Sequence, residues 1–136
     1  MAKKRTPAQL KKELWELCKQ ITRRRYVRPD GTFVCYTCDS IIQEAKSAHT
    51  GHFLPSSTCG AYLRHNLRNL RIQDFRCNIQ LGGSGAEYYR RMLEEVGEDE
   101  VAQLFRDKQK TVKADSIFYQ NLIDEYKEIL AVDNAK

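Results

Sequence analysis

The hydrophobic pattern first predicts a helix near the start of the chain. Apolar residues recur at helical spacing from Leu10 to Ile21. The preceding Thr6-Pro7-Ala8-Gln9 has the form of a capping box with proline at the first helical position. We therefore expect a helix over about residues 7–24 that packs its apolar stripe into the core.

The middle of the chain predicts short extended segments separated by turns. Pro29-Asp30-Gly31 is a turn signal, and several segments after it are apolar, β-branched or alternating. Strands or extended segments are expected at residues 32–36, 49–53, 62–64 and 66–72. A short helix or turn is expected at residues 74–81, ended by Gly82-Gly83.

The last third of the chain predicts helices. Ser84-Gly85-Ala86-Glu87 resembles a second capping box, and the helix after it should end at Gly97. Further helices are expected over residues 98–105 and from about Asp115 or Ser116 to Ala131. The pattern thus predicts an α+β fold in which residues 1–136 form one domain. This domain would consist of an N-terminal helix (7–25), a core (32–83) and a C-terminal helical region (84–136).

Length and charge narrow the class of protein. The chain has 136 residues, enough for one ordinary domain. Apolar runs stay well short of the roughly 20 residues that cross a bilayer, and no signal peptide is recognisable. We therefore expect a cytoplasmic protein. Residues 1–85 hold 15 Lys/Arg against 6 Asp/Glu, and residues 86–136 hold 8 against 12. A polyanion such as DNA should therefore meet the first part.

Arginines are the candidate DNA contacts. Their guanidinium groups can bind phosphates in a bidentate way, and the interleaved Tyr26 could stack on an unpaired base. A solvated face is the alternative interpretation. The candidates are Arg23, Arg24, Arg25, Arg28, Arg68 and Arg71.

The cysteines predict a structural zinc site. Cys35 and Cys38 are two residues apart, and Cys77 follows some forty residues later. The fourth ligand is Asp74, Cys59 or His65, and we favour Asp74 because it stands three residues before Cys77, where a second knuckle has its first ligand. The alternative is a redox pair at Cys35 and Cys38 with Cys77 as a buried apolar residue.

A histidine pair and an asparagine are candidates for catalysis. The imidazole of His52 could deprotonate water near neutral pH. Asn78 directly follows a predicted zinc ligand and could offer an amide oxygen to a catalytic divalent cation, with His49 as a second ligand. Such a cation would neutralise the charge that develops during phosphodiester hydrolysis.

These residues occur in the order of a known family. The series Cys35-x-x-Cys38, Gly51-His52-Phe53, Leu63-Arg64, Asn69, Gln73 and Cys77-Asn78, then Tyr89-x-x-x-Leu93 and Val96-Gly97, resembles the NinG/Rap family of phage recombination endonucleases. That family resembles in turn the HNH, or ββα-metal, nucleases, which include the endonuclease VII type. The resemblance runs from about Leu10 to Leu130.

The resemblance implies a nuclease that acts on branched DNA such as Holliday junctions or D-loops. It implies structural Zn²⁺ and catalytic Mg²⁺, with His52 as general base and Asn78 as a ligand of the catalytic metal. Asn69 would orient the histidine loop by hydrogen bonds, and Arg64 would lie near the scissile phosphate. The family usually has Cys in place of Asp74 and Asp in place of His49. Imidazole favours softer cations, so we expect activity with Mn²⁺ at least equal to that with Mg²⁺.

Two other classes of protein compete with the nuclease. A zinc-stapled DNA-binding protein without catalysis would use the same basic face. A thiol redox protein would use Cys35 and Cys38, but no βαβ pattern surrounds them. Two cuts on opposed strands of a junction would suit a two-fold homodimer, with the flanking helices as its interface.

Overall fold

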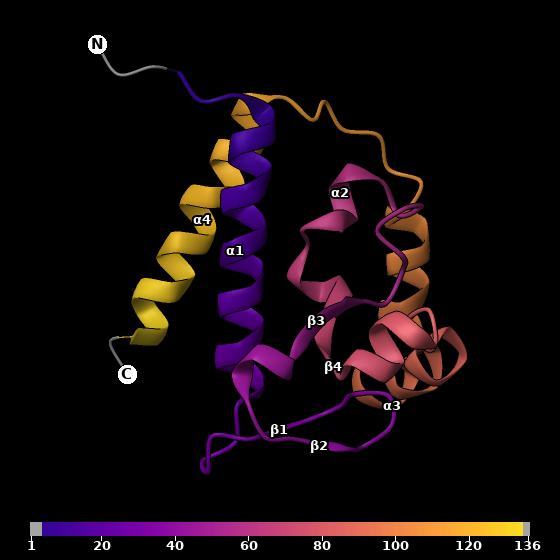
Figure 1. Cartoon of the computed structure of the whole chain (residues 1–136). Coiled ribbons are helices and arrows are strands. Elements are labelled where there is room, and N and C mark those ends of the chain that lie inside the picture. The colour runs from indigo at the N-terminus through magenta and orange to yellow at the C-terminus, as the bar shows by residue number, and fades with distance from the viewer. Residues whose placement is uncertain (1–3, 135–136) are drawn as a thin grey trace.

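The computed structural model describes residues 4–134, the last of them by its backbone alone. It is a mixed α+β fold with two small antiparallel sheets. The ribbon formed by β3 (His49–His52) and β4 (Leu70–Gln73) lies between helices α1 (Pro7–Tyr26) and α3 (Gly85–Asp107), as Figure 1 shows. The predicted α+β class is confirmed. No helix among residues 4–134 is long and apolar enough to cross a membrane.

Helix α1 begins where the sequence predicts. The Thr6 hydroxyl accepts a hydrogen bond from Gln9 N, and the Gln9 side chain accepts one from Thr6 N, so the capping box is formed. The helix continues to Tyr26, two residues beyond the predicted end. Its buried side is the expected apolar stripe, which includes Leu10, Leu14, Leu17, Cys18 and Ile21.

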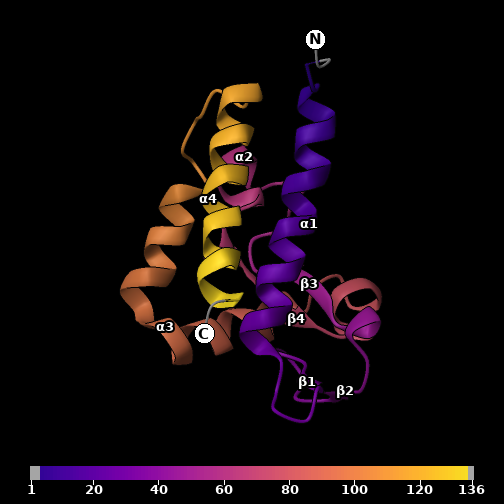
Figure 2. The ribbon, with the colours of Figure 1, turned by 90° about the vertical axis from the view of Figure 1, so that its left-hand side faces the viewer.

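Helix α4 (Ser116–Asn134) packs along α1 and runs in the same direction, as Figures 1 and 2 show together. A connection over residues 108–115 returns the chain to the start of α1, which permits this parallel arrangement. The two helices share one apolar cluster, to which α4 contributes Tyr119, Ile123, Tyr126 and Leu130. The first and last helices of the chain therefore stabilise each other.

The two sheets are short ribbons. In the central one, His49 pairs with Gln73 and His52 with Leu70. In the other, β1 (Phe33–Val34) pairs with β2 (Ile41–Ile42) below the central ribbon. The 3-10 turn η1 (Ala45–Ser47) leads from β2 into β3.

One extended segment was predicted wrongly, and another is shorter than predicted. Residues 62–64 belong to a short helix, α2 (Gly60–Arg64), in which Leu63 alone is fully buried. The predicted strand 66–72 begins only at Leu70, because the Asn66 side chain accepts a hydrogen bond from Arg68 N and closes a 3-10 turn, η2 (Leu67–Asn69). The short helix expected within 74–81 is present as the π-helical turn η3 (Arg76–Gln80).

Helix α3 merges the two helices expected before and after Gly97. Gly97 has φ 88°, so the backbone breaks at the glycine that the pattern marks, but the helix resumes directly after it. The capping box predicted at Ser84 is absent. Ser84 has φ 52°, and its side chain makes no capping hydrogen bond, because a capping side chain needs an extended backbone at this position.

Candidate functional site

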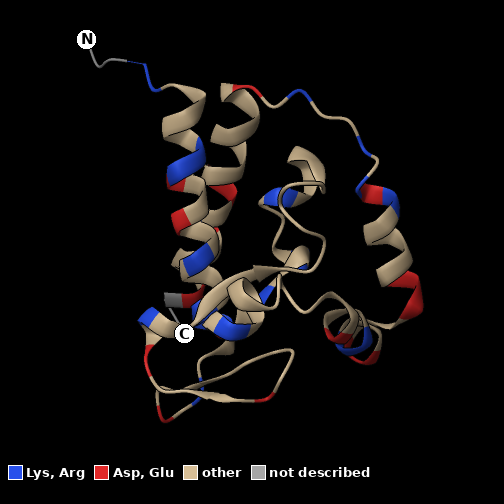
Figure 3. Ribbon diagram, turned by 45° about the vertical axis from the view of Figure 1, so that its right-hand side comes forward, with Lys and Arg blue, Asp and Glu red and all other residues tan. Residues whose placement is uncertain are grey.

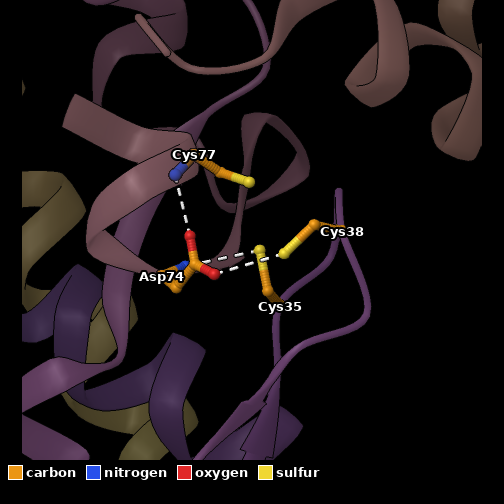
Figure 4. A group of neighbouring side chains, drawn as sticks. All are labelled: Cys35, Cys38, Asp74 and Cys77. Atoms are coloured by element: carbon orange, nitrogen blue, oxygen red, sulfur yellow. Dashed lines mark hydrogen bonds between the residues drawn. The ribbon is translucent and has the colours of Figure 1, made fainter. Parts of the chain in front are cut away.

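Three thiols and one carboxylate converge between the β1–β2 ribbon and η3. Figure 4 shows Cys35 and Cys38 arriving from the ribbon, and Asp74 and Cys77 from the segment after β4. The four candidate ligand atoms all lie within 4.8 Å of one another. Three sulfurs and one oxygen suit tetrahedral Zn²⁺, so the cluster could hold a metal ion such as zinc.

Backbone hydrogen bonds shape this cluster. Asp74 N donates to the Cys35 sulfur at 3.4 Å, and Cys77 N donates to one Asp74 carboxylate oxygen at 2.8 Å. The other Asp74 oxygen faces the Cys38 sulfur at 3.2 Å. Asp74 therefore caps the start of η3 with one oxygen and turns its second oxygen toward the thiols.

The donor set itself favours a cation. Burial raises the pKa of Cys35, but hydrogen bonds from Asp74 N and from the Thr37 hydroxyl and backbone more than offset this, so the pKa lies below its usual value. Burial, with a smaller contribution from the Asp74 carboxylate, raises the pKa of Cys38 to about 12. Grouping several anionic donors is unfavourable unless a cation lies among them.

The two other candidates for the fourth position lie elsewhere. Cys59 is buried in an apolar cluster with Phe53 and Leu63, and its sulfur faces the Gly60 carbonyl oxygen. His65 is buried near α1 and α4, where burial lowers its pKa to about 4. The structure thus brings Asp74 to the three thiols and leaves Cys59 and His65 apart.

His52 is held on the side of the ribbon that faces α1. Its Nε2 donates to the Arg64 carbonyl oxygen at 2.8 Å, and its ring stacks on Trp15 with centroids 5.2 Å apart and planes 10° from parallel. Burial lowers the pKa of His52, although the bond to the Arg64 carbonyl opposes this. With Nε2 donating, the neutral ring has its lone pair on Nδ1, which makes no hydrogen bond within residues 4–134.

Asn69 fixes the chain immediately after His52. It is fully buried, its Oδ1 accepts from Leu54 N at 2.8 Å, and its Nδ2 donates to the Leu54 carbonyl oxygen at 3.0 Å. Phe53 N also donates to the Asn69 carbonyl oxygen. The asparagine therefore clamps residues 53 and 54, and through them the end of β3.

His49 and Asn78 meet on the other side of the ribbon. Asn78 Nδ2 lies 3.2 Å from His49 Nδ1, and the ring of Phe75 lies edge-on to the imidazole. The segment after β4 thus presents Asn78 to β3 and Cys77 to the thiol cluster. Because the amide nitrogen donates, Nδ1 of His49 holds the lone pair of the neutral ring, and Nε2 carries the proton. A cation at this place would replace the hydrogen bond, with Nδ1 of His49 and the turned amide oxygen of Asn78 as its ligands.

His49 and His52 project to opposite faces, because they are three residues apart in one strand. The register agrees, since His52 lies opposite Leu70, which packs with α1, whereas His49 lies opposite Gln73. The structure therefore joins Asn78 with His49 and places His52 in a separate set of contacts with α1. The sequence gives no signal for the stacking of Trp15 on His52 beyond its position beside the apolar stripe of α1.

The six arginines named as DNA contacts divide into two groups. Arg24, Arg25 and Arg28 are exposed near the end of α1, and Arg23 Nε faces the Ala48 carbonyl oxygen. Figure 3 shows Lys and Arg along α1.

The other two arginines form ion pairs within the fold. Arg68 pairs with Glu100 and Asp107 of α3, and Arg71, only 5% exposed, pairs with Glu95. The expectation for Arg71 is corrected, because its guanidinium lies inside the fold and neutralises Glu95.

Arg64, expected near a phosphate, contributes in another way. Its carbonyl oxygen holds His52, while its guanidinium Nε donates to the Ser56 carbonyl oxygen at 3.1 Å. The side chain thus braces the loop between β3 and α2.

An open cleft of about 660 Å³ lies beside His49. Its walls come from residues 41–47 and from the chain around Phe75, and they include Lys46 and Arg76. The sequence analysis did not select Phe75, although an aromatic residue between Asp74 and Arg76 in a short polar turn was a possible signal.

Fold and site together define a small α+β protein with a candidate metal centre of three thiols and a carboxylate. The family described as Bacteriophage Lambda NinG protein matches residues 1–134, so the chain belongs to this family. Neither the curated proteins nor the solved structures contain a significant match.

Proposed function

We propose that this protein is a metal-dependent DNA endonuclease of the ββα-metal (HNH) type that cuts branched recombination intermediates. The observation that carries the proposal is the hydrogen bond from His52 Nε2 to the Arg64 carbonyl oxygen. It selects the tautomer in which Nδ1 can accept a proton, and the lowered pKa keeps the ring neutral near pH 7. The ribbon β3–β4 followed by η3 gives the ββα order of elements.

In this proposal His52 accepts the proton of the attacking water. His49 and Asn78 would hold a divalent cation, which supplies positive charge to the phosphate oxygens during hydrolysis. Within residues 4–134, strand β3 pairs only with β4, and its other edge has no strand partner. At that edge a phosphodiester could reach groups on both faces of the strand. Asn69 positions the loop, and the thiol cluster with structural Zn²⁺ fixes η3 relative to the ribbon.

The DNA surface in this proposal consists of the exposed arginines at the end of α1. Arg24, Arg25 and Arg28 can contact phosphates without giving up a buried ion pair. Arg68 and Arg71 are left out, because their ion pairs hold α3 against the ribbon.

The test is nicking of synthetic four-way junctions and linear duplexes by wild type and by two single variants. His52→Ala should lower the cleavage rate by about 10²- to 10⁴-fold with every cation while leaving junction affinity intact. His49→Ala should instead weaken cleavage in a way that added cation partly restores. If the effects of these two substitutions are exchanged, His49 is the base and the assignment of His52 fails.

The identity of the catalytic cation gives a second test. With His49 as a ligand, Mn²⁺ should support cleavage at least as well as Mg²⁺ at equal concentration. His49→Asp should shift this preference toward Mg²⁺, because carboxylate oxygen suits the harder cation. Wild-type activity far higher with Mg²⁺ would exclude His49 as a ligand.

If the wild-type protein nicks no DNA with either cation, the alternative is favoured, a zinc-stapled DNA-binding protein. A homodimer remains part of the proposal, because a junction needs two opposed cuts. The apolar faces that α1 and α4 pack against each other are not available to such an interface, so it would use other faces of the flanking helices. Sedimentation of the protein with and without a junction would test the dimer.

A further inference from the structure

The cleft beside His49 contains an exposed aromatic ring that the proposed chemistry does not use. Phe75 is 51% exposed, and Ile41 on the opposite wall is 48% exposed. Phe75 belongs to none of the apolar core clusters, and among the described aromatic rings it contacts only His49, edge-on at 5.9 Å. About half of the Phe75 surface is therefore open to a ligand, next to a candidate cation ligand.

The charges around the cleft favour a nucleotide as the occupant. Arg76 is exposed on its wall and can bind phosphate, and Lys46, also exposed, can do so when its surface ion pair with Glu44 opens. Of the two acidic residues in the lining, Glu44 pairs with Lys46 at 3.2 Å, and Asp74 turns its carboxylate toward Cys38 and Cys77. A flat apolar base on Phe75 with its phosphate at Arg76 would satisfy both the ring and the cation.

We infer that the cleft binds one unpaired nucleotide, with its base stacked on Phe75. In a continuous duplex the base faces are covered by neighbouring pairs, so only a base at a branch, bulge or end can enter the cleft. This inference rests on DNA as the proposed substrate and extends that proposal, because it provides a reason for selecting branched over linear DNA. A second copy of the chain, docking through the apolar residues Phe75, Ile79 and Leu81, is the competing occupant.

The test compares affinity for two labelled DNAs by fluorescence anisotropy, without added Mg²⁺ or Mn²⁺ so that no strand is cut. One DNA carries a single unpaired nucleotide at a branch, and the other is the fully paired duplex. Phe75→Ala should weaken binding of the branched DNA by about 5- to 100-fold and leave duplex binding within about twofold. Phe75→Tyr should preserve the preference, because a tyrosine ring stacks equally well.

Ile79→Ala is the matched control, because Ile79 is 56% exposed on η3, the turn that directly follows Phe75, but does not line the cleft. It should change neither affinity. The inference is overturned if Phe75→Ala weakens both DNAs equally, if Ile79→Ala has the same effect, or if sedimentation shows a wild-type dimer that Phe75→Ala dissociates.

The outcome is separable from that of the nuclease proposal. If the protein nicks junctions but Phe75→Ala does not change the ratio of affinities for branched and duplex DNA, only the nucleotide site is disproved. If Phe75→Ala changes this affinity ratio but the wild-type protein nicks no DNA, the nucleotide site is supported and the nuclease proposal is disproved.

Discussion

At the scale of single residues, Trp15 controls the environment of His52. Stacking excludes water from one face of the imidazole, and burial is the main cause of the lowered pKa of His52. Trp15→Ala should let the pKa rise toward its usual value of about 6.5. NMR titration of the His52 ring protons would measure the shift.

The cleavage rate should follow the same shift. In the proposed mechanism His52 is the general base and acts in its neutral form, so cleavage should fall as pH drops through the pKa of His52. The acidic limb of the pH–rate profile should therefore move to higher pH in Trp15→Ala, while Trp15→Phe, which keeps a stacked ring, should move it less. An unchanged or lower pKa in the alanine variant would show that Trp15 does not set the proton affinity of His52.

At the scale of elements, the β3–β4 ribbon depends on the absence of a side chain at position 51. A Cβ on Gly51 would lie 1.9 Å from Gln73 Oε1. Gln73 cannot swing away freely, because it is fully buried and its Nε2 donates to Thr37 Oγ1 and to the Gly83 carbonyl oxygen. Gly51→Ala should therefore lower the free energy of unfolding by about 1–3 kcal/mol in urea titrations.

Gly85→Ala is the matched control for this substitution. A Cβ at Gly85 meets nothing within 4 Å, and its φ is not positive. Its free energy of unfolding should stay within about 1 kcal/mol of wild type. Equal losses in both variants would mean that the contact with Gln73 is not the cause.

Elements with complete local signals were predictable from the sequence, and those that depend on distant partners were not. The Thr6–Gln9 capping box fixes the start of α1, and the Cys35-x-x-Cys38 spacing indicates the thiol cluster. By contrast, Ser84 has the residues of a cap without its backbone conformation, and the ion pair of Arg71 needs Glu95, which lies 24 residues away. Sequence spacing carries no information about such partners, because they meet only when the helices pack.

At the scale of the whole molecule, the core of residues 4–134 consists of three clusters, and only one of them contains candidate metal ligands. The α1–α4 cluster and the cluster under α3 are built from large apolar side chains. The third joins the β1–β2 ribbon to η3 through Phe33, Ile42 and Ile72 and includes the candidate ligands Cys35 and Cys77. A metal ion at the thiols would therefore stabilise this third cluster most directly.

Removal of the metal should accordingly loosen one part of the molecule before the rest. In the purified protein, a zinc chelator should speed amide hydrogen exchange in residues 33–42 and 74–80, while α1 and α4 keep their protection, because their shared apolar face needs no ion. Cys38→Ser should reproduce this pattern without chelator, and Cys59→Ser, which alters a thiol outside the group of four, should not. Uniform loss of protection across all helices would show that the fold is a single cooperative unit around the metal. Unchanged exchange would show that the thiols hold no structural ion.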